Sequence, residues 1–221
     1  MNTLYLITVL AFFANAFAGS PVLQVDTTQG PMLGHMDAGV RVWKGIPYAQ
    51  PPVDDLRWEY PIRPAAKTEV YEANVDVNGC AQECVLPPGN CPSFGQSEDC
   101  LYLTVMSPEG PSSDPDGYPV FFWIHGGAYT QGAGNTPLYN GTTFAQNNVV
   151  NVVINYRLGA LGFMAGDGMT GNYGLMDQRL ALQWTQDNIK SFGGNPAKVT
   201  VGGQSAGAMS VGSHLISPGS K

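Results

Sequence analysis

Apolar and polar positions follow different patterns in the two halves of this chain. In the first half, residues 22–26 and 31–36 alternate around a Gly-containing turn at 28–30, which predicts an antiparallel hairpin. Residues 40–43 have a similar pattern, and we expect them to extend that small sheet. Residues 47–64 are rich in proline, which predicts irregular chain. The first half therefore predicts a small β structure followed by a loop.

The second half has longer apolar runs. Residues 101–106 predict a strand, and residues 120–124 and 149–154 are apolar on both faces, as expected of strands buried between helix layers. From 174 to 192 the apolar residues recur at helical spacing, and a β-branched run at 199–201 follows. Strand, long helix and strand in this order predict an α/β sheet, in which ligands bind at the carboxyl ends of the strands.

The β-branched run leads directly into the pentapeptide Gly203-Gln204-Ser205-Ala206-Gly207, and helix-compatible residues come next. A G-x-S-x-G sequence between a strand and a helix is typical of a nucleophile elbow. Its serine occupies a strained turn with the hydroxyl raised above the sheet, and the flanking glycines lack side chains that would collide there. Ser205 is therefore the candidate nucleophile.

A second glycine-rich turn follows the apolar strand at 120–124. His125-Gly126-Gly127-Ala128 can direct backbone N–H groups into a cleft, where they would stabilise an oxyanion together with the N–H of Ala206. The alternative is that the two glycines only make a turn. The presence of the elbow motif in the same chain favours the oxyanion interpretation.

None of the three histidines is a credible base for the serine. His35 belongs to the hairpin region and is expected at the surface, and His125 is expected to make a structural hydrogen bond in the turn. His214 lies on the helix after the serine, about 13 Å along its axis. Asp167 and Asp177 precede the serine and are interpreted as structural. The chain therefore offers a nucleophile without its base.

Composition narrows the class of protein further. The chain has 221 residues, of which 43% are hydrophobic and 12% charged, and a net charge of −7. Its acidic residues are scattered, and without clustered Lys and Arg a nucleic-acid partner is not expected. The acidity is most simply interpreted as a contribution to solubility.

The N-terminal segment is interpreted as a signal peptide over residues 1–18, which leaves 19–221 as the mature chain. Residues 4–17 are almost wholly apolar, and Ala16 and Ala18 are the small residues that a signal peptidase requires. A membrane anchor is the alternative, but the segment is short and Gly19-Ser20-Pro21 interrupts it. We expect secretion and no stable membrane anchor.

Four cysteines, Cys80, Cys84, Cys91 and Cys100, lie within 21 residues. An even number in an oxidising compartment predicts disulfides. Three pairings of the four cysteines are possible. In the nested pairing, the first cysteine bonds to the last and the two middle cysteines bond to each other. A metal site is the alternative, but the cluster contains no histidine. Closing the outer loop should contribute about 3 kcal/mol to stability. Asn140-Gly141-Thr142 is a glycosylation sequon, which we expect on a surface loop.

The chain resembles the N-terminal part of the type-B carboxylesterase/lipase family, which also contains the cholinesterases. The matching segments occur in the family's order at 43–49 (WKGIPYA), 56–58 (LRW), 97–103 (SEDCLYL), 125–128 (HGGA), 171–178 (GNYGLMDQ), 188–189 (NI), 192–196 (FGGNP) and 203–207 (GQSAG). They are distributed in order over nearly the whole expected mature chain, so the resemblance is highly specific.

This resemblance implies an α/β-hydrolase sheet and hydrolysis of a small carboxylic ester through a serine acyl-enzyme, with no cofactor and no metal. Ser205 matches the acyl-accepting serine. The oxyanion hole is matched by Gly127, Ala128 and Ala206 as donors, with Gly126 shaping the turn. Ala128 replaces a glycine of many members, but only its N–H is required.

Other matched positions are structural or concern specificity. Cys80 and Cys100 match a disulfide that closes the loop before the central sheet, which leaves Cys84 and Cys91 as the inner pair. Arg57 and Glu98 match a buried ion pair that fastens this loop. Asn90 replaces the cation-binding Trp of cholinesterases, and Gln204 replaces a Glu of many members. A preference for choline esters is therefore not expected.

Family members are more than twice as long, and their triad acid and histidine lie beyond the position of Lys221. We therefore expect an incomplete hydrolase sheet and an isolated chain that is poorly stable and nearly inactive. A non-catalytic adhesion module of the same family and an inactive truncated form are the alternatives. The intact Ser205 with its two glycines favours the enzyme. The sequence does not indicate an oligomeric state.

Overall fold

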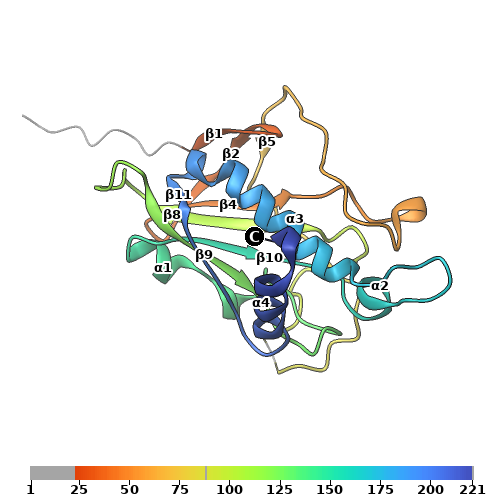
Figure 1. The fold of residues 1–221 in the computed structure, drawn as a ribbon. Coiled ribbons are helices and arrows are strands. Elements are labelled where there is room, and N and C mark those ends of the chain that lie inside the picture. The colour runs from red at the N-terminus through yellow and green to blue at the C-terminus, as the bar shows by residue number, and fades with distance from the viewer. Residues whose placement is uncertain (1–22, 88, 221) are drawn as a thin grey trace, which may run out of the picture.

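The computed structural model of the chain describes residues 23–87 and 89–220, so the signal peptide expected at 1–18 lies outside the described residues. A six-stranded mixed sheet forms the centre of the fold, in the order β11-β9-β10-β8-β4-β3 (Figure 1). β9, β10 and β11 are parallel to one another, and β8, β4 and β3 continue the sheet in antiparallel pairs. The strands are β3 (His35–Asp37), β4 (Val40–Pro47), β8 (Tyr102–Pro108), β9 (Tyr118–Ile124), β10 (Val150–Ile154) and β11 (Gly194–Gly203).

The N-terminal hairpin is present, but its second strand ends at Leu33 rather than at residue 36, because His35–Asp37 pair with β4 in the central sheet. β1 (Gln24–Thr27) and β2 (Gly30–Leu33) pair antiparallel, and β5 (Tyr71–Glu72) adds to β2. The expectation that residues 40–43 extend this small sheet is wrong, because β4 pairs with β3 and β8 in the central sheet. The physical reason is burial. Trp43 is fully buried and packs edge-on against Phe192 in the main core, a position that the edge of a small hairpin cannot provide.

One long helix covers one face of the central sheet. α3 (Tyr173–Asn188) runs across the strands (Figure 1), and its buried side chains join those of the strands in one cluster that includes Phe122, Ile154 and Trp184. The predicted helix at 174–192 is thus confirmed, except that Ile189–Phe192 form a 3₁₀ turn. Gly193 then ends it with φ of 89°, a conformation that glycine adopts at little cost.

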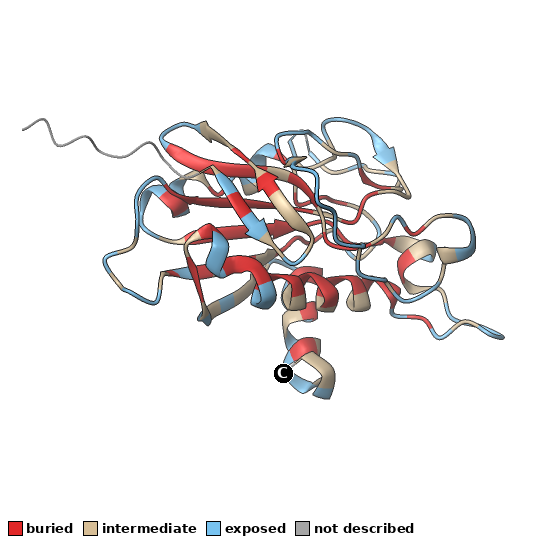
Figure 2. Ribbon diagram, turned by 90° about the horizontal axis from the view of Figure 1, so that it is seen from above, coloured by how far each residue is buried: buried red, intermediate tan, exposed pale blue. Residues whose placement is uncertain are grey.

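The opposite face of the sheet is covered less completely. The short helix α1 (Thr142–Gln146) packs Ala145 against Val42 and Met106. Phe121 and Trp123 point to this face and stay half-exposed, whereas β10 is buried throughout. Figure 2 shows the buried residues concentrated along the middle of the sheet. The prediction of strands buried between helix layers therefore holds for β10 but only for one face of β9, because α1 is too short to reach across.

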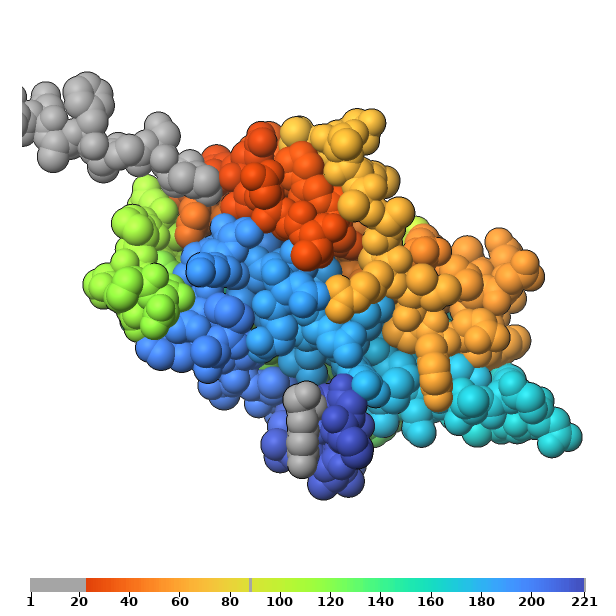
Figure 3. Space-filling model, turned by 45° about the horizontal axis from the view of Figure 1, so that its top comes forward, coloured from red at the N-terminus to blue at the C-terminus, as the bar shows by residue number. Residues whose placement is uncertain are grey.

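The remaining elements are α4 (Ala206–Ile216), which follows β11, and several short helices, strands and turns. α4 packs against β11 and β9 and stands out from the body of the molecule (Figure 3). Among residues 23–87 and 89–220, no helix combines the length and the apolarity needed to cross a bilayer. The other elements are α2 (Gly159–Phe163), β6 (Gly79–Cys80), β7 (Gln96–Ser97), and the 3₁₀ turns Asp54–Leu56, Pro137–Tyr139 and Pro218–Ser220.

Candidate active site

The predicted elbow connects β11 to α4. Ser205 has φ of 55° and ψ of −120°, which is a strained conformation for a residue with a side chain, and it is exposed. A Cβ on Gly207 would lie 2.1 Å from the carbonyl oxygen of Ile124, and one on Gly203 would lie 2.4 Å from the carbonyl carbon of Gly207. Both glycines are therefore required for strand and helix to approach this closely.

The glycine-rich turn after β9 lies against the elbow. β9 and β11 are neighbouring parallel strands, and Ile124 is the register partner of Gly203, so both bends leave the same edge of the sheet. A Cβ on Gly126 would lie 2.5 Å from the carbonyl oxygen of Gln204 and 3.1 Å from the Cβ of Ser205. The structure thus brings together the two motifs that are 80 residues apart in the sequence.

Three backbone N–H groups at these bends are unused. Within the part of the chain that the structure describes, the N–H groups of Gly127 and Ala128 donate to no acceptor. Ala206 begins α4, so its N–H lacks an intrahelical acceptor. Gly127 has φ of 117°, and Ala128 has φ of 56°, a left-handed conformation that costs an alanine about 1 kcal/mol. Free N–H groups beside a serine can stabilise an anionic oxygen.

The buried side chain of His125 stabilises the glycine-rich turn. Its Nδ1 donates to the carbonyl oxygen of Gly126 at 2.8 Å, and its ring stacks on Tyr156, whose hydroxyl donates to the His125 carbonyl at 2.9 Å. Burial lowers the pKa of His125 to about 4, because it penalises the charged imidazolium. His125 is therefore neutral and structural, as expected from the sequence.

The low pKa of His125 predicts a pH dependence of stability. The unfolded chain takes up this proton near pH 6.5 and the folded chain only near pH 4, so lowering the pH through this window favours unfolding. His125 alone should lower the free energy of unfolding by about 3 kcal/mol between pH 7 and pH 4. Urea unfolding at pH 7 and at pH 4 gives the free energy of unfolding of the natural chain and of His125→Phe. The difference between the two chains should change by that amount between the two pH values. A difference that does not change with pH would contradict this assignment.

The other two histidines lie elsewhere in the fold, on α4 and on β3. Nε2 of His214 lies 3.0 Å from Oε1 of Gln178, and Nδ1 lies 3.0 Å from Oγ of Ser220. Burial lowers the pKa of His214 as well. His35 was expected at the surface, but this is wrong: it is half-buried on β3, where its Nδ1 is covered because the strand pairs with β4. No described histidine hydrogen-bonds to the serine.

A buried ion pair fastens α3 to the end of β10. Asp177 accepts from Nε and Nη2 of Arg157 at 2.9 and 2.7 Å, and from the backbone N–H of Arg157 at 3.0 Å. Both side chains are almost completely buried. Asp177 is thus structural, as the sequence indicated, whereas its partner was missed. The sequence signal for this pair is that Arg157 comes just after an almost wholly apolar strand. An arginine that is buried there needs an acidic partner. Asp167, by contrast, is exposed.

The cysteine loop is closed by two nested disulfides and one ion pair. Arg57 binds Glu98 through two hydrogen bonds of 2.5 and 2.7 Å. The expectation that this pair is buried is wrong, since 34% of the Arg57 side chain and 28% of the Glu98 side chain are exposed. The pair spans the rim of the loop, where solvent reaches both groups. The disulfides join Cys80 to Cys100 and Cys84 to Cys91.

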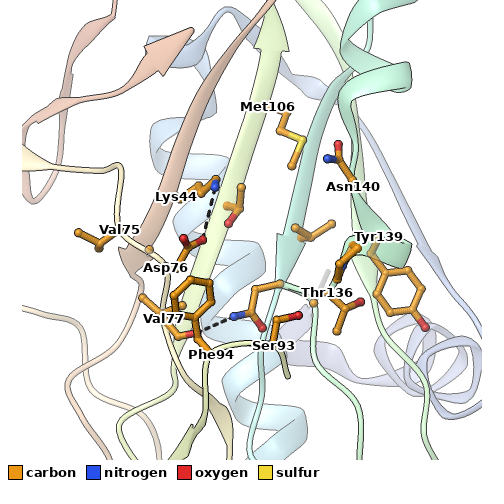
Figure 4. A pocket seen from close by; sticks show the side chains of 16 residues that line it. Lys44, Val75, Asp76, Val77, Ser93, Phe94, Met106, Thr136, Tyr139 and Asn140 are labelled. Atoms are coloured by element: carbon orange, nitrogen blue, oxygen red, sulfur yellow. Dashed lines mark hydrogen bonds and ion pairs between the residues drawn. The ribbon is translucent and has the colours of Figure 1, made fainter. Parts of the chain in front are cut away.

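Two cavities lie on the less covered face of the sheet. One, of about 250 Å³, is bounded by the cysteine loop and contains the ion pair between Lys44 and Asp76, but it does not reach the elbow (Figure 4). The other, of about 480 Å³, adjoins the elbow through Gln204, and its lining carries no charged side chain. Asn140 is exposed at the rim of both, and its Oδ1 accepts from the N–H and hydroxyl of Thr142. The second lining consists of Asn90, Phe121, Trp123, Leu138, Tyr139, Asn140, Phe144, Asn151, Val153 and Gln204.

No group of three His, Cys, Asp or Glu side chains within residues 23–87 and 89–220 is placed to hold a metal ion. The described residues place an exposed serine beside unused backbone donors. Such an arrangement is suited to attack on a carbonyl carbon.

Known proteins are similar to this chain in sequence and fold. The sequence model described as "Carboxylesterase family" matches residues 21–221. The cAMP-regulated D2 protein of Dictyostelium discoideum is 50% identical over 87% of this chain and 36% of its own length. The para-nitrobenzyl esterase of Bacillus subtilis is 43% identical over 90% of this chain and 41% of its own. A solved PNB esterase structure superimposes with a TM-score of 0.84 at 43% identity, over 90% of this chain and 41% of that one.

The chain thus spans about two-fifths or less of the length of these relatives. Its mixed sheet, with helices packed on it, is part of the α/β-hydrolase fold of its structural neighbours. With a family match over nearly all of its residues and the serine elbow beside the glycine-rich turn, this chain belongs to the carboxylesterase family.

Proposed function

We propose that this chain carries the acyl-accepting part of a carboxylic ester hydrolase. Oγ of Ser205 attacks the ester carbonyl, and the N–H groups of Gly127, Ala128 and Ala206 stabilise the negatively charged oxygen that forms. The bond to the alcohol then breaks, the serine proton leaves with the alcohol, and water later releases the acid from the acyl-serine. The observation that carries this proposal is the contact of Gly126 with Ser205 and Gln204.

The base that takes the serine proton is proposed to come from outside residues 23–220. Both buried histidines have hydrogen-bond partners other than the serine, and burial lowers their pKa values. We propose that the acid and the histidine of the triad correspond to a part of the relatives that this chain does not span. The chain of residues 1–221 should then hydrolyse esters slowly, with only binding and oxyanion stabilisation to accelerate the reaction. A non-catalytic binding module is the alternative.

The ester is proposed to carry an uncharged, apolar group. Gln204 stands next to the nucleophile and lines the cavity of about 480 Å³. Four aromatic rings give this lining apolar surface, and no charged side chain contributes to it. Relatives named for para-nitrobenzyl ester cleavage agree with this preference.

Secretion is also proposed for this chain. Two disulfides in one loop are typical of an oxidising compartment. The apolar segment at 4–17 with Ala16 and Ala18 supports cleavage after Ala18. Asn140 is exposed and is the proposed glycosylation site.

The proposed function predicts that Gly126→Ala slows acylation of Ser205. The new methyl group would clash with the carbonyl oxygen of Gln204 and displace the turn from the elbow. With imidazole supplied as an external base, the rate of phosphonylation by a fluorophosphonate should fall about 100-fold, the effect of losing an oxyanion donor. Gly110→Ala is the matched control, because a Cβ there meets no atom within 4 Å. An unchanged rate in a folded Gly126→Ala chain would refute the proposed role of the turn.

A further inference from the structure

The side chain of Gln82 pairs with the backbone of Gly132. Its Oε1 accepts from the N–H of Gly132 at 2.6 Å, and its Nε2 donates to the carbonyl oxygen of Gly132 at 2.8 Å. The same Nε2 donates to the carbonyl oxygen of Cys80 at 2.9 Å. The amide thus uses both of its donor hydrogens and its oxygen to join two segments that are 50 residues apart in the sequence.

Gly132 in turn packs against the glycine-rich turn. It has φ of 102°, and a Cβ on it would lie 2.5 Å from the carbonyl oxygen of Gly126 and 2.8 Å from Nδ1 of His125. The carbonyl of Gly127 closes the turn by accepting from the N–H groups of Thr130 and Gln131, both at 3.0 Å. The backbone at Gly132 therefore supports the turn on the side where its carbonyl groups lie.

The geometry of a peptide bond connects this contact to the proposed oxyanion hole. The carbonyl of Gly126 and the N–H of Gly127 belong to one planar peptide unit. His125 and Gly132 fix the carbonyl end of this unit. They therefore also fix the direction in which the N–H of Gly127 points.

The segment that carries Gln82 is itself rigid. It lies between Cys80 and Cys84, which belong to the two nested disulfides, and the N–H of Gln82 donates to Oε1 of Gln96 at 2.9 Å. A second contact joins the loop to the residue before Gly132, since the N–H of Val85 donates to Oε1 of Gln131 at 2.9 Å. The cysteine loop can therefore hold the chain after the turn at two successive residues.

We propose that Gln82 is a positioning residue for the oxyanion turn, which it holds through Gly132. This role rests on the proposed function, because it concerns the N–H groups assigned to the oxyanion. Gln82 does not touch the substrate in this account. Through Gln82 and Gly132, the disulfide-closed loop restrains the peptide unit between Gly126 and Gly127.

The test compares Gln82→Met, which keeps the side-chain length but removes the amide, with Gln50→Met. Gln50 is the matched control because its amide binds the carbonyl of Arg63, away from the turn. Hydrogen exchange of residues 126–132 and phosphonylation of Ser205 in the presence of imidazole are measured on the complete chain, together with the thermal midpoint.

We expect Gln82→Met to speed exchange at 126–132 and to slow phosphonylation, each by about tenfold, the effect of losing one or two hydrogen bonds. Gln50→Met should change neither rate. Unchanged exchange at 126–132 would overturn the proposal, and so would faster exchange spread over the whole sheet with an equal loss of thermal stability. The exchange experiment decides the positioning role even if Ser205 proves unreactive in the natural chain, a result that would refute the proposed function instead.

Discussion

Replacing Ser205 by glycine is expected to abolish phosphonylation while making the chain more stable than replacement by alanine. Loss of Oγ removes the nucleophile in both variants. Only glycine, however, adopts φ of 55° with ψ of −120° without strain. The strain of such a residue is worth about 1–3 kcal/mol, and the greater freedom of glycine in the unfolded chain offsets about 0.4–1 kcal/mol of it. The Ser205→Gly chain should therefore exceed Ser205→Ala in unfolding free energy by about 1 kcal/mol.

Urea unfolding of the two variants measures this difference, and mass spectrometry after treatment with a fluorophosphonate measures the loss of reactivity. Equal stability of the two variants would show that the elbow is not strained. Residual labelling at the level of the natural chain would show that another residue reacts.

Replacing Asp177 by alanine is expected to cost about 3–5 kcal/mol of unfolding free energy, because it leaves the charge of Arg157 buried and unpaired. The carboxylate also accepts the N–H of Arg157, so one change removes three hydrogen bonds at the junction of α3 and β10. Asp187→Ala is the matched control. Its partner Arg63 is exposed, and its loss should cost less than about 1 kcal/mol.

Urea unfolding again gives the measurement, and a double variant keeps the test decisive if Asp177→Ala fails to fold. Arg157→Met combined with Asp177→Leu removes both charges and should regain most of the stability. An Asp177→Ala chain that unfolds like the Asp187→Ala control would contradict the assignment of a buried ion pair.

The sequence predicted those parts of the fold that depend on short stretches of chain. The hairpin, the strands at 101–106 and 120–124, the long helix and the strand-to-helix elbow each depend on local periodicity and turn residues. The adjacency of the elbow and the glycine-rich turn followed from one further rule, that parallel strands place their carboxyl ends at one edge. The positions of both bends are therefore encoded in local sequence.

Contacts between segments that are distant in the sequence cannot be predicted from local periodicity and turn residues. Residues 40–43 look the same whether they extend a hairpin or the central sheet, and only the burial of Trp43 decides between the two. The pairing of Gln82 with Gly132 joins segments 50 residues apart, and no periodicity indicates it. The exposure of Arg57 and Glu98 likewise depends on how the loop lies over the body. Such features depend on tertiary packing rather than on local pattern.

The central claim is that Ser205 is held against backbone donors while the described residues provide no base. The most direct measurement is the site and rate of fluorophosphonate labelling of the natural chain, with and without imidazole, read by mass spectrometry. We expect a single adduct on Ser205 that forms slowly alone and faster as imidazole is added. A Ser205 that stays unmodified under both conditions, or an adduct on a different serine, would contradict it.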